Sequence, residues 1–133
     1  MTIYECLYHS SKAVGLYPTM NADTILFILE DCKANLLIVE DEKTLNALYP
    51  YWSQLPNLKK IIKWGDPILE TVTYSENVLH WADVMCLGME DEDDQAILER
   101  NKNMAINQCC SLIYTSGTTG NPKGKVMSIS LTN

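Results

Sequence analysis

The spacing of the apolar residues changes from strand-like to helix-like and back over the first forty positions of the chain. Residues 13–17 form a short apolar run closed by Pro18, which predicts a buried strand. Asn21 is of a type that caps helices, and apolar residues recur behind it at helical spacing: Ile25, Ile28, Leu29 and Cys32. Asn35 is expected to end that helix. The continuously apolar residues 36–39 predict a strand covered on both faces, so this part of the chain predicts a strand–helix–strand unit.

The alternation continues over the next seventy residues. A second helix is expected from about residue 42, and Pro50 should kink or end it because proline cannot donate a backbone hydrogen bond. Residues 58–64 predict a third strand that stops at Gly65. The remaining expectations are an irregular stretch at 67–77, a short helix at 78–87, and a helix from the acidic run 90–94 to about residue 103.

A last short apolar run, residues 109–114, predicts another strand. Together with the preceding alternation it predicts an α/β fold, with a mostly parallel sheet and flanking helices. A chain of 133 residues can hold one domain at most. Ligands of such sheets bind beyond the carboxyl ends of the strands, and the segment after residue 114 is expected to lie at such an end.

The residues after that strand are small, hydroxylated or basic. Gly117, Gly120 and Gly124 can adopt positive φ angles and allow a ligand to approach the backbone. Hydroxyl groups and successive loop N–H groups can surround an anion, and Lys123 can bring a positive charge to the same place. We interpret the segment as a loop that binds nucleotide phosphates. Its candidate binding residues are Thr115, Ser116, Gly117, Thr118, Thr119, Gly120, Asn121, Pro122 and Lys123.

This segment has two other interpretations. The loop of P-loop NTPases needs Gly-x-x-x-x-Gly-Lys-Ser/Thr between a strand and a helix. Here three residues separate Gly120 from Gly124, and Val126 stands where a hydroxyl should hold magnesium. Residues 125–131 alternate as in a strand, so the P-loop interpretation is rejected. The plain alternative is a Gly/Thr-rich turn that joins two strands.

Residues 114–124, Tyr-Thr-Ser-Gly-Thr-Thr-Gly-Asn-Pro-Lys-Gly, resemble without a gap the phosphate-loop signature of the adenylate-forming enzymes. That superfamily contains acyl-CoA synthetases, luciferases and the adenylation domains of peptide synthetases. The sequences at 13–17, 30–35 and 107–110 narrow the resemblance to the bubblegum-type long-chain acyl-CoA synthetases. The likeness extends from about residue 12 to residue 124.

This resemblance implies a two-step reaction. A long-chain fatty acid attacks the α-phosphorus of ATP, and the thiol of coenzyme A then displaces AMP from the acyl-adenylate. It implies Mg²⁺ beside ATP, and a cytoplasmic location that allows peripheral association with endoplasmic-reticulum membranes. It assigns residues 12–133 to part of an AMP-binding domain and leaves residues 1–11 as an atypical N-terminal segment.

The resemblance further predicts a fragment of a longer ligase that is inactive alone. The family's segments for adenine, ribose and the adenylation lysine are not found in the 133 residues, so no catalytic residue is assigned. After residue 124 the family continues Val-Met-Leu-Ser-His, whereas here Lys125 precedes Val126 and no histidine follows. Two functions therefore stay open: a piece of a fatty-acid-activating ligase, and a non-catalytic nucleotide- or partner-binding module.

Composition argues against several other classes of function. The net charge of −7 disfavours a nucleic-acid surface, which requires clustered Lys and Arg. No run approaches the ~20 apolar residues of a membrane helix, and the N-terminus does not have the pattern of a signal peptide. Five cysteines without metal-ligand spacing indicate reduced thiols, and His9 and His80 stand alone. No metal site is predicted.

Overall fold

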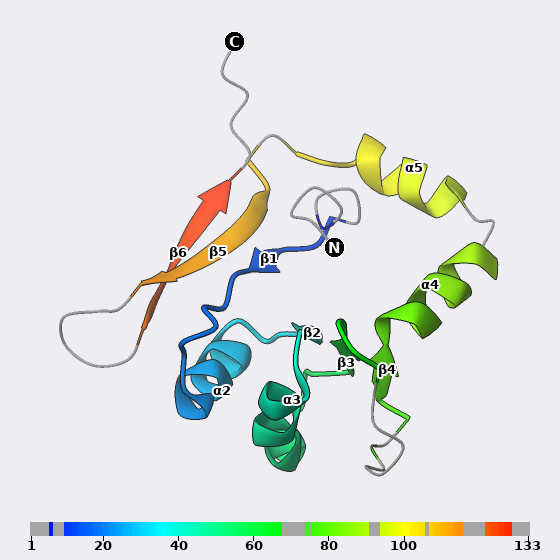
Figure 1. Ribbon diagram of the computed structural model, residues 1–133. Helices are drawn as coiled ribbons and strands as arrows, with labels where there is room; N and C mark the ends of the chain where they lie inside the picture. Colours follow the sequence, from blue (N-terminus) through cyan, green and yellow to red (C-terminus); the bar gives the residue numbers. More distant parts are fainter. Residues whose placement is uncertain are drawn as a thin grey trace. The chain divides into compact units, whose positions relative to one another are not determined.

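The computed structural model describes residues 6, 10–67, 74, 76–90, 94–105, 107–115 and 122–128. The chain divides into two compact units, one from residues 1–19 and 92–133 and the other from residues 20–91 (Figure 1). In chain order the elements are β1 (Ala13–Val14), α2 (Ala22–Asp31), β2 (Leu36–Val39), α3 (Glu42–Leu48), the 3₁₀ helix η1 (Tyr49–Gln54), β3 (Lys60–Lys63), β4 (Val78–His80), α4 (Trp81–Glu90), α5 (Asp94–Lys102), β5 (Cys109–Thr115) and β6 (Lys123–Ser128).

Each unit contains a three-stranded sheet. The sheet of residues 20–91 has the order β2-β3-β4 with both pairings parallel. The other sheet has the order β1-β5-β6, in which β1 is parallel to β5 and β6 is antiparallel to it. Three of the four described pairings are therefore parallel, which confirms the mostly parallel α/β prediction.

The predicted strand–helix–strand unit over residues 13–39 is wrong, because β1 and β2 belong to different sheets. The two residues of β1 pair instead with Ser111 and Leu112, almost a hundred positions along the chain. The Ser111 hydroxyl adds a hydrogen bond to the Ala13 carbonyl oxygen at 2.9 Å. The parallel unit that does form is β2–α3–β3, one element later than expected.

Helix α2 begins as the sequence predicts and ends earlier. The Asn21 side chain accepts a hydrogen bond from the Thr24 backbone N–H at 2.9 Å, and Ile25, Ile28 and Leu29 are buried. The helix ends at Asp31 because Lys33 adopts a left-handed conformation with a φ of 52°. The backbone N–H groups of residues 33 and 34 then return to the carbonyls of residues 30 and 29, so Asn35 is not the terminator.

Helix α3 confirms the expected effect of Pro50. The regular helix stops at Leu48, and the chain continues as the 3₁₀ helix η1 with the proline in its first turn. Leu45 and Leu48 are 0% and 2% exposed, and α3 packs against α2 and β2. These two leucines therefore belong to the core of this unit.

The Asp41 carboxylate caps α3 and makes its stability depend on pH. It accepts hydrogen bonds from the Thr44 backbone N–H at 2.7 Å and the Thr44 hydroxyl at 3.2 Å, and the backbone hydrogen bond holds the pKa of Asp41 below its ordinary value. A lowered folded-state pKa stabilises the fold at neutral pH, and that contribution is lost as the pH falls below about 3.9.

We expect Asp41→Ala to lower the free energy of unfolding by about 1 kcal/mol at pH 7, whereas Asp41→Asn keeps the cap and changes little. Urea titrations of the two variants and the unchanged chain at pH 7 and at acidic pH would measure this. At acidic pH the free energy of unfolding of the unchanged chain should fall relative to that of the Asp41→Asn variant, because the carboxylate becomes protonated. If the difference in free energy of unfolding between the two proteins does not depend on pH, the charged cap is contradicted.

The expected helix at 78–87 is wrong over its first three residues, which form β4 parallel to β3. Helix α4 starts behind them, and His80 caps it: the Ala82 backbone N–H donates to His80 Nδ1 at 3.2 Å. The His80 backbone N–H donates to the Asp83 carboxylate at 3.2 Å, and Nε2 lies 3.3 Å from the Gly65 carbonyl oxygen. This lone histidine therefore has a structural role at a helix N-terminus.

The end of β3 combines a buried lysine with a glycine turn. Lys63 is only 2% exposed, and its ammonium group donates to the Asp66 carbonyl oxygen. Gly65 has a φ of 88°, and a Cβ added there would lie 2.9 Å from the Glu40 carbonyl oxygen. The expected stop of the strand at Gly65 thus has both a conformational and a steric cause.

The acidic run is divided between two helices. Glu90 is the last residue of α4 and Asp94 the first of α5, while residues 91–93 lie outside the described part. The irregular stretch expected at 67–77 also falls largely outside it. Within the described ranges, no helix combines the length and apolar character that crossing a membrane requires.

Candidate phosphate-loop site

The predicted loop connects the two strands of a β-hairpin. Thr115 is the last residue of β5, Lys123 is the first of β6, and the two are directly paired across the hairpin. Both side chains are exposed, and Pro122 is half-buried beside Lys123. Six of the nine candidate residues, Ser116, Gly117, Thr118, Thr119, Gly120 and Asn121, lie outside the described residues.

The strands on either side of this segment agree with both interpretations of it. The segment joins β5 to β6, which are neighbouring antiparallel strands, as the plain turn would (Figure 1). It also follows the carboxyl end of β5, which pairs in parallel with β1 on its other side, as expected for a ligand loop. Backbone topology therefore does not separate the two interpretations, and the residue types of the loop must do so.

Gly124 does not adopt the positive φ that a glycine allows. Gly124 lies inside β6, and Gly65 is the described glycine with a left-handed backbone. Gly124 is paired with Tyr114, and an added Cβ would lie 3.0 Å from Cζ and 3.1 Å from Cε1 of that tyrosine ring. The glycine therefore makes room for a side chain rather than for a ligand at its own position.

The pairing places the two hairpin lysines on one face. Directly paired residues of an antiparallel ladder point to the same side, and successive residues point to opposite sides. Lys123 therefore shares a face with Thr115, and Lys125 shares that face with its partner Ile113. The Tyr114 ring, 3% exposed, lies on the opposite face. Lys125 thus occupies a regular strand position that adds a second positive charge to the exposed face.

The adjacent cysteines at the start of β5 are held by backbone groups. The Cys110 thiol donates to the Met127 carbonyl oxygen at 3.4 Å, and the Cys109 thiol lies 3.8 Å from the Ser111 carbonyl oxygen. The ladder is irregular between Cys109 and Ser111. In the part of the chain that the structure describes, no cluster of His, Cys, Asp and Glu side chains has the arrangement of a metal site.

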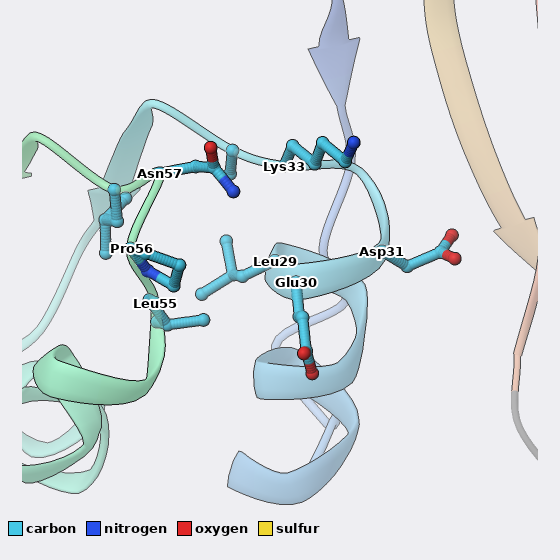
Figure 2. Close-up of a pocket in the computed structure, with 9 residues that line it drawn as sticks. Leu29, Glu30, Asp31, Lys33, Leu55, Pro56 and Asn57 are labelled. Atoms are coloured by element: carbon cyan, nitrogen blue, oxygen red, sulfur yellow. The ribbon is translucent and has the colours of Figure 1, made fainter.

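A hollow lies in the unit of residues 20–91. It has a volume of about 400 Å³ between the end of α2 and residues 55–58. Figure 2 shows Leu29 directed towards Leu55 and Pro56, with Asn57 at the rim and Asp31 pointing away. This hollow adjoins the amino ends of β2 and β3, whereas parallel sheets bind ligands at the carboxyl ends. Its lining residues include none of the candidate residues 115–123.

The family model and the curated relatives that match this chain agree with one another. A family model described as AMP-binding enzyme matches residues 1–130. A long-chain-fatty-acid–CoA ligase of Xenopus laevis, ACSBG2, is 41% identical over 124 residues, which cover 92% of this chain and 16% of that protein. The human long-chain-fatty-acid–CoA ligase ACSBG1 is 38% identical over 116 residues, covering 86% of this chain and 15% of that protein. The chain thus spans about a sixth of the length of these curated relatives.

Solved structures show the same fold at low sequence identity. A variant of the coronafacic acid ligase from Pectobacterium brasiliense superposes with a TM-score of 0.69 at 20% identity, covering 96% of this chain and 22% of that one. A luciferase from Phrixothrix hirtus gives a TM-score of 0.63 at 18% identity, covering 95% and 23%. These two likenesses concern the fold alone.

Proposed function

The chain belongs to the AMP-binding enzyme family, and on that premise we propose that it carries the phosphate-binding part of a long-chain-fatty-acid–CoA ligase. The observation that carries this proposal is the 41% identity to the Xenopus laevis ligase over 92% of the chain. The proposed reaction activates a fatty acid with ATP as an acyl-adenylate and transfers the acyl group to coenzyme A.

The described ends of the loop suit a polyphosphate. Thr115 offers a hydroxyl group and Lys123 a positive charge, and their pairing brings both to the mouth of the loop. Bringing a carboxylate to a triphosphate joins two negatively charged groups, so donors and cations that face the phosphates lower the barrier. We assign residues 115–123 to binding of the β- and γ-phosphates, and we assign no residue of this chain to acid–base or nucleophilic catalysis.

The proposal includes Mg²⁺, ATP and coenzyme A. The Thr115 hydroxyl and the Lys123 ammonium fit the phosphates of a nucleotide, while no metal-binding cluster is found among the described residues. We therefore place the magnesium ion on the nucleotide phosphates, where it would neutralise negative charge. A cytoplasmic location, with peripheral contact to membranes, remains a prediction.

The role of Lys123 can be tested in a full-length relative that carries the same signature. We expect replacement of the lysine equivalent to Lys123 by alanine to raise the activation free energy of adenylate formation by at most ~2.7–4 kcal/mol. The thioester step should change less, because the polyphosphate is present only in the first step. Pyrophosphate release would measure the first step, and coenzyme A consumption from purified acyl-adenylate the second.

The second half-reaction is the internal control for misfolding in this experiment. An equal loss in both steps would mean that the lysine supports the fold rather than the phosphates, which would contradict the assignment. Unchanged adenylation would contradict it as well.

A further inference from the structure

Tyr114 and Gly124 make an unusually close pair at the base of the candidate loop. They face each other across β5 and β6, one pair away from Thr115 and Lys123. An ideal Cβ on Gly124 would lie within 3.0, 3.1 and 3.3 Å of Cζ, Cε1 and Oη of the tyrosine. Glycine weakens a strand interior, so its presence here needs a packing reason, and the tyrosine ring that an added Cβ would meet supplies one.

This contact bears on the register of the hairpin. A shift of one residue in a strand moves every side chain to the other face of the sheet. In the observed register Lys123 shares a face with Thr115, and a one-residue slip would place Lys123 on the face of the Tyr114 ring. A Cβ at this position would require the ring to move by a few tenths of an ångström, so the ring favours the register that brings Gly124 opposite Tyr114.

We propose that Tyr114 is a positioning residue, whose ring packed on Gly124 fixes the hairpin register and so holds Lys123 beside Thr115 at the mouth of the loop. This inference rests on the proposed function, because it assigns the held lysine to phosphate binding. Tyr114 is 3% exposed and lies on the opposite face, so it acts through Lys123 rather than on a ligand.

Amide hydrogen exchange of the 133-residue chain tests, without any ligand, whether the contact between Tyr114 and Gly124 fixes the hairpin register. Gly124→Ala should speed exchange in β5 and β6 by about tenfold or more, because the new methyl group meets the ring. With Tyr114→Leu already present, the same substitution should change exchange by less than about twofold, since the shorter side chain can give way. Tyr114→Phe should keep the protection.

Gly15→Ala is the matched control, because it lies in the same unit and an added Cβ there would meet nothing within 4 Å. Exchange in the hairpin should not respond to it. If Gly124→Ala changes amide exchange equally with tyrosine and with leucine at position 114, the Tyr114 ring does not fix the register and the inference is overturned.

Binding of inorganic tripolyphosphate, measured by calorimetry, tests the positioning role. We expect Lys123→Ala and Gly124→Ala each to weaken binding by about tenfold, the loss typical of one hydrogen bond to a charged group. In the Lys123→Ala background, Gly124→Ala should cause no further loss, because its effect is exerted through that lysine. Lys102→Ala, an exposed lysine of α5 in the same unit, serves as the charge control and should change affinity by less than about twofold.

The outcomes separate this inference from the proposed function. Additive losses for Lys123→Ala and Gly124→Ala would show a merely structural contact and overturn the positioning role while phosphate binding stands. If the unchanged chain does not bind tripolyphosphate, the proposed phosphate site is contradicted, and the positioning role with it. This holds even if the exchange results show that the Tyr114 ring fixes the register.

Discussion

The 133-residue chain, mixed with ATP, magnesium, palmitate and coenzyme A, is expected to release no pyrophosphate and to form no thioester. Catalysis of this reaction needs the carboxylate, the α-phosphate and later the thiol to be held in reactive positions, and such positioning contributes ~7–11 kcal/mol of barrier reduction. The candidate groups that this chain offers, from Thr115 to Lys123, face the outer phosphates in our proposal. Binding those phosphates alone leaves the reacting atoms unordered.

A sensitive pyrophosphate assay and a thioester assay would measure this, with a boiled sample as the blank and a full-length relative as the positive control. Either product above the blank would contradict the prediction. Binding of ATP without adenylate agrees with it and leaves room for the second function considered from the sequence, a non-catalytic nucleotide-binding module. Formation of adenylate by a chain extended to the length of the curated relatives would decide for the ligase.

Local signals in the sequence were sufficient where the cause of the structure is local. Asn21 predicted the start of α2 because its side chain can reach the Thr24 backbone N–H within one turn. Pro50 predicted the end of α3 because the missing donor acts at its own position. Both features depend only on residues a few positions apart, so a sequence contains the information directly.

Strand partners were harder to predict from the sequence, because pairing depends on residues far apart in the chain. β1 has two residues, and nothing in them specifies β5 rather than β2 as the neighbour. β4 was missed because its apolar residues run straight into the apolar start of α4. The boundary between them is made by His80, whose ring reaches the Ala82 backbone N–H, and a lone histidine gave no such indication.

The candidate site shows the same division. The hydroxyls, glycines and charge of the loop, from Thr115 to Lys123, predict phosphate binding from the sequence alone. The sequence does not indicate the proposed role of Tyr114, because that role depends on the register that brings Gly124 opposite its ring. A sequence motif that begins with an aromatic residue and ends with a glycine ten positions later is compatible with such a pair, but only the strand pairing identifies it.

The largest loss of stability from a single substitution is expected at the centre of the unit that contains α2 and α3. Leu45 is fully buried on α3, which packs against α2 and β2. Truncation to alanine removes apolar burial and leaves a cavity that the surrounding helices and strand fill only in part. Leu45→Ala should therefore lower the free energy of unfolding by ~2–5 kcal/mol, measured by urea titration or pulse proteolysis.

Leu87→Ala is the matched control for this prediction, since it makes the same substitution within a helix at a residue that is 57% exposed. Helix propensity changes in the same direction at both sites, so the difference between the two variants isolates burial. Leu87→Ala should stay within about 0.5 kcal/mol of the unchanged chain, as surface substitutions usually do. Equal losses at the two positions would mean that α3 does not form the core, and that its two buried leucines are held in place by something other than the packing of α2, α3 and β2.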